Sequence, residues 1–164
     1  MSLTIRTFKF TDWNWVSKVY NEGIKTGIAT FETQVPDYNS WDKKYIDSCR
    51  IVAELENEVV GFAVLSQVSE RSVYKGVAEV SVYVSKKSRG QGIGQKLLNE
   101  LILQSETNGF WTLQAGIFSQ NKASIELHKK CGFRIIGVRE KIGCLKGKWF
   151  SNQFLERRSK IIGI

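Results

Sequence analysis

The feature that most constrains the fold is a change of hydrophobic period across a short glycine-rich turn. Residues 77–84 alternate apolar and polar side chains, as a half-buried strand does. In residues 91–108 the apolar side chains instead recur at the period of an amphipathic helix. The basic segment between them carries glycine at positions 90, 92 and 94. A strand that enters a helix through such a turn predicts an α/β domain.

The rest of the chain extends this pattern. Alternating or apolar runs predict strands at residues 3–6, 51–55, 59–68, 77–84, 111–117, 133–143 and 149–156. Helical spacing predicts a helix through residues 16–24 and further helices at 41–49, 91–108 and 122–131. Thr11 and Asp12 offer a cap to the first helix, and Ser40 offers one to the second. The order β-α-α-β-β-β-α-β-α-β-β predicts a mixed sheet with helices on its faces. We expect a single domain over residues 1–164, a length that can bury its own core.

Composition narrows the possible partners. The net charge of +8 favours an anionic partner, which nucleic acid, anionic lipid or a polyphosphate ligand would each provide. The longest apolar stretches, such as residues 59–65, are far shorter than the roughly 20 residues that cross a bilayer, so we expect no membrane association. The N-terminus lacks a basic region followed by an apolar run, so we expect a cytoplasmic protein. Three widely spaced cysteines and one histidine predict reduced thiols and no metal site.

The turn at residues 85–94 has the chemistry of a phosphate-binding site. Small residues let the backbone approach an anion, and the first N–H groups of a helix are unpaired donors at the positive end of its dipole. The turn differs from the dinucleotide fingerprint, G-x-G-x-x-G, because the third glycine is missing. It also lacks the Gly-Lys-Ser/Thr that ends a Walker loop. The turn therefore predicts pyrophosphate binding and disfavours nucleotide hydrolysis.

Two sequence blocks resemble those of one enzyme superfamily. Residues 89–94, Arg-Gly-Gln-Gly-Ile-Gly, resemble the acetyl-CoA signature Q/R-x-x-G-x-G/A of the GNAT superfamily of N-acetyltransferases. Residues 121–133 are similar to that superfamily's later segment, N-x-x-A/S-x-x-L-Y/H-x-x-x-G-F. The resemblance implies the GNAT fold, a mixed and mostly antiparallel sheet of about seven strands flanked by about four helices. It also implies acetyl-CoA as cosubstrate, without a metal.

Within the superfamily the chain is similar to phosphinothricin and methionine sulfoximine acetyltransferases. Residues 20–24, 29–33, 78–84 and 147–149 carry this likeness, together with the Leu127-His128 pair. The likeness implies acetyl transfer, through a ternary complex, to the primary amine of a small amino-acid-like acceptor, and a homodimer. Two stretches depart from the family. Phe150-Ser151-Asn152 lacks an aspartate that is common after the tryptophan, and residues 66–70 replace a loop richer in proline and arginine.

Other functions stay open at this point. A superfamily member could acetylate a polyamine, an aminoglycoside, or a protein N-terminus or lysine, and another could bind acetyl-CoA without catalysing transfer. A basic nucleic-acid-binding module is a further alternative. Because no helix-turn-helix, zinc-finger or stacking pattern is present, we expect no nucleic-acid partner.

The resemblance also implies which residues hold the coenzyme. The backbone of the strand before the signature would pair with the pantetheine arm, and the amides of the turn would hold the pyrophosphate, with an arginine near the phosphates. Two residues at the start of the later helix would contact pantetheine and the phosphates. In this sequence the set is Val82, Tyr83, Val84, Arg89, Gly90, Gln91, Gly92, Ile93, Gly94, Gln95, Asn121 and Ser124.

The candidate catalytic residues are Glu79 and His128. An amine attacks only when neutral, so a base must accept the ammonium proton, directly or through water, and Glu79 is our candidate. Period-two geometry places Glu79 on the face opposite Val82 and Val84 unless the strand carries a bulge, which this fold usually has. His128 stands where the superfamily often has a tyrosine that protonates the departing thiolate. A surface carboxylate and a structural histidine are the alternatives.

The acceptor site is inferred from family positions. Arg71 could hold a carboxylate bidentately, which suits an amino-acid-like acceptor. The aromatic members of the set have core packing as the alternative. The full set is Phe31, Glu32, Arg71, Tyr74 and Trp149.

Overall fold

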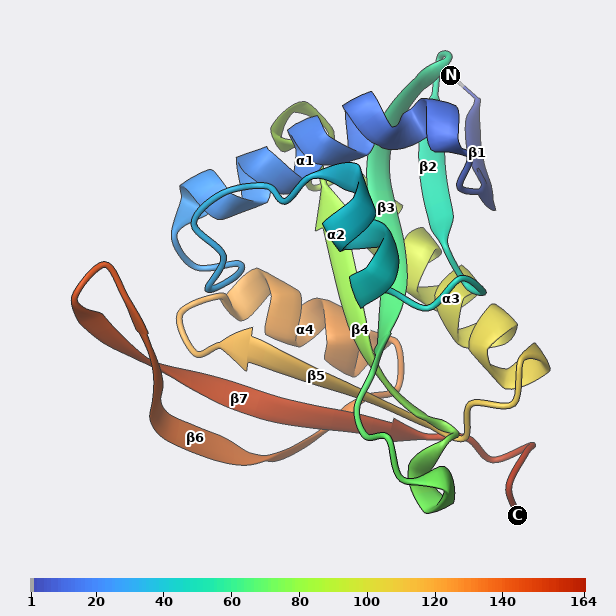
Figure 1. Cartoon of the computed structure of the whole chain (residues 1–164), viewed down its shortest axis with the longest axis vertical. Helices are drawn as coiled ribbons and strands as arrows, with labels where there is room; N and C mark the ends of the chain where they lie inside the picture. The colour runs from blue at the N-terminus through green and yellow to red at the C-terminus, as the bar shows by residue number, and fades with distance from the viewer. Residues whose placement is uncertain (1) are drawn as a thin grey trace.

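Seven strands form one sheet in the spatial order β1-β2-β3-β4-β5-β7-β6 (Figure 1). The structure is a computed structural model and describes residues 2–164. The strands are β1 (Leu3–Thr7), β2 (Ile51–Leu55), β3 (Glu58–Gln67), β4 (Val77–Val84), β5 (Thr112–Phe118), β6 (Arg134–Leu145) and β7 (Lys148–Arg158). The helices are α1 (Trp13–Thr26), α2 (Tyr38–Lys44), α3 (Ile93–Thr107) and α4 (Lys122–Lys130). The predicted order of elements and the mixed sheet with helices on its faces are confirmed.

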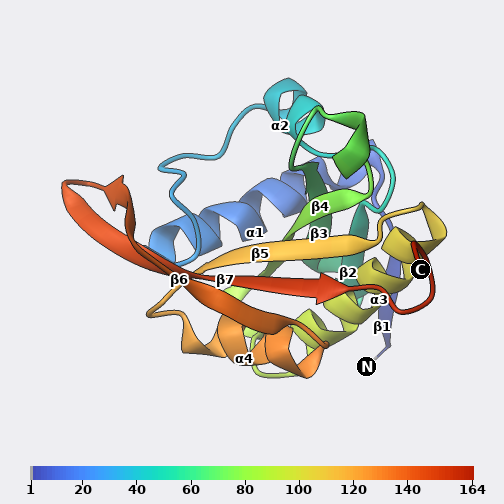
Figure 2. The ribbon, with the colours of Figure 1, turned by 90° about the horizontal axis from the view of Figure 1, so that it is seen from below.

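The sheet is covered on both faces. Figure 2 shows α1 and α2 on one side of the strands and α3 and α4 on the other. The larger core lies under α3, where Leu97, Leu98 and Leu101 pack among small and branched side chains of the central strands. The second core is aromatic and lies under α1 and α2, around Trp41 and Phe62. Among residues 2–164, no helix is both long and apolar enough to cross a bilayer.

The sheet opens between β4 and β5, its only parallel neighbours within the described residues. Their ladder consists of three residue pairs and ends where Glu79 lies opposite Gln114. On the outer sides pairing continues, since β3 and β4 stay paired to the end of β4, and β5 and β7 stay paired to Phe118 and Asn152. Residues 80–84 of β4 and 115–118 of β5 therefore face each other across a split. Their backbone groups on the side of the split are not paired with another strand of the described chain.

Some predicted details are wrong. The second helix is not residues 41–49 but Tyr38–Lys44, and Asp37 rather than Ser40 caps it, because the Asp37 carboxylate accepts from the backbone N–H of Ser40 at 2.8 Å. Asp12 precedes α1 but makes no side-chain capping bond, because its carboxylate binds Arg6. The third helix begins at Ile93, two residues later than predicted.

The expected bulge in β4 is also wrong. The ladder between β3 and β4 runs without a register shift from Gly61 and Val84 to Gln67 and Ala78. Strict alternation along β4 therefore places Glu79 on the face opposite Val82 and Val84. The two groups of residues therefore lie on opposite faces of the sheet.

Candidate active site

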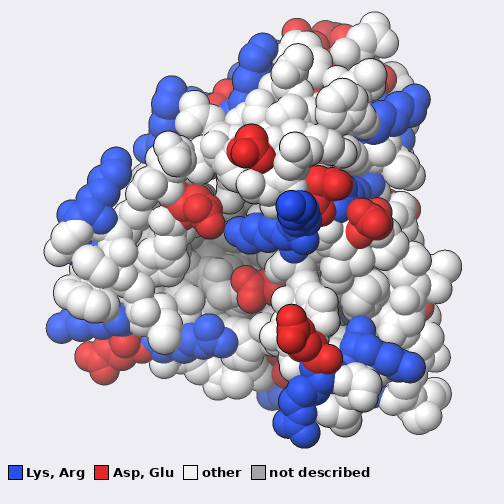
Figure 3. Space-filling view, in the orientation of Figure 1, with Lys and Arg blue, Asp and Glu red and all other residues white. Residues whose placement is uncertain are grey.

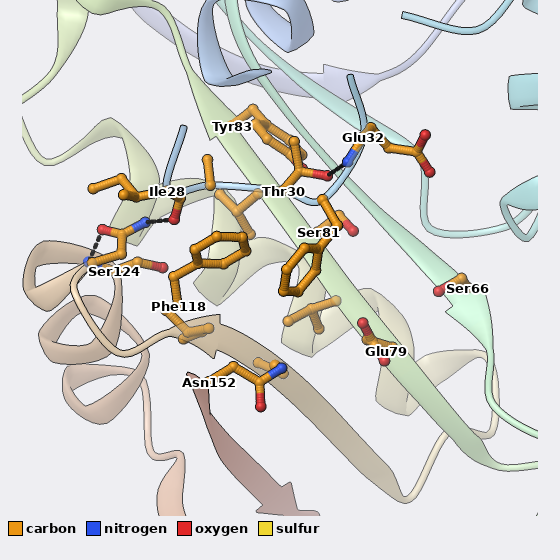
Figure 4. Close-up of a pocket in the computed structure, with 18 of the residues that line it drawn as sticks. Ile28, Thr30, Glu32, Ser66, Glu79, Ser81, Tyr83, Phe118, Ser124 and Asn152 are labelled. Atoms are coloured by element: carbon orange, nitrogen blue, oxygen red, sulfur yellow. Dashed lines mark hydrogen bonds between the residues drawn. The ribbon is translucent and has the colours of Figure 1, made fainter. Parts of the chain in front are cut away.

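A cavity of about 270 Å³ passes through the split between β4 and β5 (Figure 4). Consecutive residues line it on both strands, 79–83 on β4 and 115–118 on β5. Because neighbouring side chains of a strand point to opposite faces, a cavity can border all of them only where the strands separate. The cavity therefore connects the α1–α2 face of the sheet with the α3–α4 face.

A groove of about 510 Å³ adjoins the cavity on the α3–α4 side. It runs between the glycine-rich turn and α4, and basic side chains of Arg89 and Lys130 border it. The groove and the cavity have five lining residues in common, which are Ile28, Val82, Tyr83, Asn121 and Ser124. A long ligand in the groove can thus place one end in the cavity.

The glycine-rich turn exposes backbone donors to this groove. Gly90 and Gly92 adopt left-handed conformations, with φ of 75° and 77°, that glycine takes without strain. A Cβ atom at either position would meet nothing within 4 Å, so the turn is open to a ligand. The N–H of Lys96 donates to the carbonyl of Gly92 at 3.2 Å, and this bond starts α3. The amides just before it have no acceptor one turn back, and they suit an anion at the helix N-terminus.

Glu79 enters the cavity from its α1–α2 side (Figure 4). It is half-buried and lies between Ser66 on β3 and Gln114 on β5. Within residues 2–164 its carboxylate has no ion-pair or hydrogen-bond partner that would compete for a proton. Glu79 can therefore accept a proton from a group bound in the cavity.

Three tyrosines enclose the same side of the cavity. Burial raises the pKa of the Tyr20, Tyr45 and Tyr83 phenols above the ordinary value of 10. The Tyr83 ring stacks on Phe62 and meets the Tyr20 ring edge-on at 5.0 Å. A Cβ atom at Gly23 would come within 2.7 Å of Tyr83, so that glycine gives the ring its space. All three phenols are uncharged near neutral pH and provide hydrogen-bonding groups without a charge.

His128 reaches the cavity from α4 on the opposite face. It is 5% exposed, and its ring meets Phe133 edge-on at 5.2 Å. Its Nδ1 atom lies 2.7 Å from the carbonyl oxygen of Ser124, which can only accept, so Nδ1 carries the hydrogen. Burial lowers the pKa of His128 below its ordinary value of 6.5. At neutral pH the ring is therefore uncharged, with a lone pair on Nε2, and it must gain a proton before it can act as an acid.

The burial of neutral His128 predicts a pH-dependent stability. Below about pH 6.5 an unfolded chain binds a proton at this side chain, whereas the folded chain does so only at lower pH. The free energy of unfolding should therefore fall as the pH drops from 6.5 through the lowered pKa. Urea unfolding between pH 7.5 and 5 should show a steeper fall for the wild type than for His128→Asn. If the free energy of unfolding fell equally with pH in both proteins, His128 would have the same pKa in the folded and the unfolded chain.

The loop between α1 and α2 closes the cavity on one side. Asn121 donates to the carbonyl of Ile28 at 3.4 Å and ties this loop to α4. Phe31 packs on Phe118 with ring centroids 4.5 Å apart. Gly143 of β6 lies against the Phe31 ring, and a Cβ atom at position 143 would collide with that ring. Glu32 borders the cavity and pairs with Lys44 at 3.5 Å. Phe31 and Glu32, two members of the predicted acceptor set, thus both border the cavity.

The other three residues of the predicted acceptor set lie elsewhere. Arg71 and Tyr74 belong to a short turn before β4, where the guanidinium stacks over the Tyr74 ring at 5.4 Å, and neither borders the cavity. Trp149 is exposed near the turn of the β6–β7 hairpin and does not border it either. Since residues 66–70 lack the family's proline- and arginine-rich loop, the position of Arg71 could not be transferred from the resemblance.

The cavity also contains residues that the sequence did not single out. These are Lys44 and Tyr45, at and just after the end of α2, and Arg139 and Asn152 on β6 and β7. Asn152 could be noted only as part of a departure from the family, and nothing in the sequence marked Arg139. Figure 3 shows this face of the molecule hollowed at its centre, with acidic and basic side chains around the hollow. Within the described residues no group of three or more possible metal ligands occurs.

Comparison with known proteins agrees with this geometry. The sequence model of the Acetyltransferase (GNAT) family matches residues 10–133. A phosphinothricin N-acetyltransferase of Alcaligenes faecalis is 32% identical, and the alignment covers 94% of this chain and 81% of that protein. An L-methionine sulfoximine/L-methionine sulfone acetyltransferase of Pseudomonas aeruginosa is 28% identical, with coverage of 95% and 94%.

A solved structure extends the comparison to the fold. A GNAT phosphinothricin acetyltransferase from Sinorhizobium meliloti, in complex with AcCoA, superposes with a TM-score of 0.86 at 30% identity. The match covers 96% of this chain and 89% of that one. The sequence blocks, the split sheet and these matches together show that the chain belongs to the GNAT family of acetyltransferases.

Proposed function

We propose that this enzyme transfers the acetyl group of acetyl-CoA to the primary amine of a small amino-acid-like acceptor, through a ternary complex. The observation that carries the proposal is that a basic, amide-lined groove and a charged cavity meet at the split between β4 and β5. One ligand can enter from each side of the sheet, and their reacting ends would meet between the strands.

The coenzyme groove has the donors that acetyl-CoA requires. Amides of residues 90–95 would bind the pyrophosphate, with Arg89 and Lys130 supplying positive charge. Arg89 is held by a bond from its Nε to the carbonyl of Val84 at 3.1 Å, so its remaining nitrogens stay available for phosphate. The unpaired edge of β4 at Val82–Val84 would pair with the pantetheine amides as an added strand does.

The catalytic roles follow from the two sides of the cavity. Bound acetyl-CoA supplies a thioester carbon, at which a C–N bond forms as the C–S bond breaks and the thiolate takes up a proton. Glu79 would accept the proton of the incoming ammonium group on the acceptor side. His128 would take up on Nε2 the second proton, which the acceptor nitrogen loses as the amide forms, and would pass it to the thiolate on the coenzyme side.

The relatives and the size of the cavity support a small acceptor. The relatives' names include phosphinothricin, methionine sulfoximine and, for an Escherichia coli protein 28% identical to this chain, L-amino acids. A cavity of about 270 Å³ lies just below the usual range of ligand pockets, roughly 300–1,000 Å³. An amino acid fits this space better than an aminoglycoside or a protein substrate.

A thiol-release assay with acetyl-CoA tests the proposal. The panel should include phosphinothricin, methionine sulfoximine, free amino acids, a polyamine and an aminoglycoside, with mass spectrometry of each product. We expect N-acetylation of amino-acid-like members and a heat of association with coenzyme A in calorimetry. Acetylation confined to the polyamine or aminoglycoside would overturn the acceptor class, and no heat with coenzyme A would overturn the function itself.

We also propose that the enzyme is a homodimer. Apolar side chains are exposed along the β6–β7 hairpin, where a second copy could cover them, namely Ile135, Ile136, Val138, Ile142 and Trp149. Light scattering should give about twice the chain mass of 18.7 kDa, and Val138→Glu should shift the population toward monomer. A monomer at all concentrations would contradict the proposal.

Two further parts of the proposal concern location and partners. We propose a cytoplasmic location, which suits an acetyl-CoA enzyme with free cysteines at positions 49, 131 and 144. A nucleic-acid partner is not part of the proposal, because basic side chains already border the coenzyme groove.

A further inference from the structure

The edge strand β6 contributes an arginine to the cavity. Arg139 of β6 lies opposite Asn152 of β7, and its guanidinium carbon is 4.1 Å from the centroid of the Phe154 ring. It borders the cavity, and within residues 2–164 it forms no ion pair. Stacking fixes the plane of a guanidinium while its N–H groups stay free to bind an oxyanion bidentately.

Asn152 adds a buried amide beside it. The side chain is 8% exposed and borders the cavity from β7 (Figure 4). Its side-chain oxygen has no hydrogen-bond partner within the described residues. This oxygen can only accept a hydrogen bond, whereas the amide nitrogen of the same side chain can donate one to an oxyanion. Gly116 lies against the amide nitrogen and leaves space at this point of the wall.

The charges of the cavity indicate which kind of ligand suits Arg139. Four charged side chains border it, of which Glu32 and Lys44 pair with each other. The two that remain, Glu79 and Arg139, have opposite charge and stand on different walls. A ligand complementary to both carries a cation at one end and an anion at the other.

The distance between the walls separates the two ligand charges. Glu79 is on β4 and Arg139 on β6, three strand spacings away in the sheet order. Each spacing is about 4.8 Å, and Arg139 is level with Phe118, four residues along β5 from the partner of Glu79, so the backbones are at least roughly 14 Å apart before the side chains reach inward. The anion at Arg139 is therefore several bonds from the amine, and it belongs to the acceptor's side chain rather than to an adjacent carboxylate.

We propose that Arg139, with the amide nitrogen of Asn152 as a neighbouring donor, forms the specificity site for a distal oxyanion, a carboxylate or a phosphorus acid, at the end of the acceptor opposite its amine. The proposal rests on the proposed function. The preferred substrates are then amino acids with an acidic side chain, and their neutral isosteres are poorer.

Pairs of acceptors that differ mainly in charge test this inference. The ratio of kcat/KM for phosphinothricin over methionine sulfoximine, and for glutamate over glutamine, should fall about tenfold in Arg139→Met. A hydrogen bond to a charged group usually contributes more than this, but Arg139 is exposed and water screens its charge, so we expect the low end of the range. Arg139→Lys should restore part of the ratio. Arg134→Met is the matched control, since Arg134 is on the same strand, pairs with Glu156 at 3.0 Å and lies outside the cavity.

A second variant separates recognition from folding. Asn152→Leu removes the amide donor and should therefore lower the same ratios. The free energy of unfolding should stay equal or rise, because the unpaired buried oxygen is removed as well. Calorimetry of phosphinothricin on the coenzyme A-loaded protein gives a readout that needs no turnover, and binding should weaken in both variants. Unchanged ratios and binding in Arg139→Met would overturn the inference while leaving acetyl transfer intact. A wild type with no preference for the acidic member of each pair would overturn it as well.

Discussion

Replacing Glu79 by glutamine is expected to lower kcat by about two to four orders of magnitude, the usual contribution of a positioned base. The glutamine keeps the shape of the side chain between Ser66 and Gln114 but cannot take the ammonium proton. The calorimetric affinity for acetyl-CoA should stay the same, because the coenzyme groove lies on the other side of the split and does not include Glu79.

The pH profile distinguishes loss of a base from a merely structural defect. As pH rises, more of the acceptor is deprotonated in solution, so the deficit of Glu79→Gln should shrink between pH 7 and 10. A misfolded site would show no such recovery. Glu126→Gln is the matched control, because Glu126 is exposed on α4, pairs with Lys129 at 3.2 Å and borders neither groove nor cavity. Wild-type kcat in Glu79→Gln would show that water alone removes the proton.

The order of the elements could be predicted because it depends on local periodicity. The change of period at the glycine-rich turn and the glycines that end α3 and α4, with φ of 86° and 92°, are properties of short segments. The bounds of α2 were not predictable in this way. Asp37 and Ser40 can both cap a helix, and the helix ends when Tyr45 forms a bridge with Ser66 of β3, a contact distant in sequence.

The two halves of the candidate site also differ in whether they depend on short segments or on contacts between residues distant in sequence. The proposed coenzyme site uses backbone amides, and their presentation is encoded by glycines within a few residues of one another, so a motif could point to it. The acceptor side is assembled from α2, from the loop before it and from the β6–β7 hairpin. The positions of Arg139 and Asn152 depend on strand pairing and on the opening between β4 and β5, and no short segment encodes either. Resemblance supplied Phe31 and Glu32 but also Arg71, which lies elsewhere.

The glycine-rich turn yields the other large expected effect. Gly92 is the residue before α3, with φ of 77°, and valine in this left-handed conformation costs about 1–2 kcal/mol. In Gly92→Val the turn should relax to relieve that strain, and the amides of residues 93–95 would no longer converge on one anion. Binding must then restore the strained turn, so the Kd for acetyl-CoA should rise about 5- to 30-fold.

The opposite end of the same helix provides the control for this experiment. Gly109 follows α3 with φ of 86°, and a Cβ atom there would also meet nothing within 4 Å. Gly109→Val therefore introduces comparable backbone strain far from the groove, and it should lower the free energy of unfolding by about 1–2 kcal/mol without changing the Kd. Calorimetry with coenzyme A and urea unfolding of both variants separate the two effects. If Gly92→Val folds and binds coenzyme A as tightly as the wild type, the pyrophosphate is held by side chains and not by the amides that begin α3.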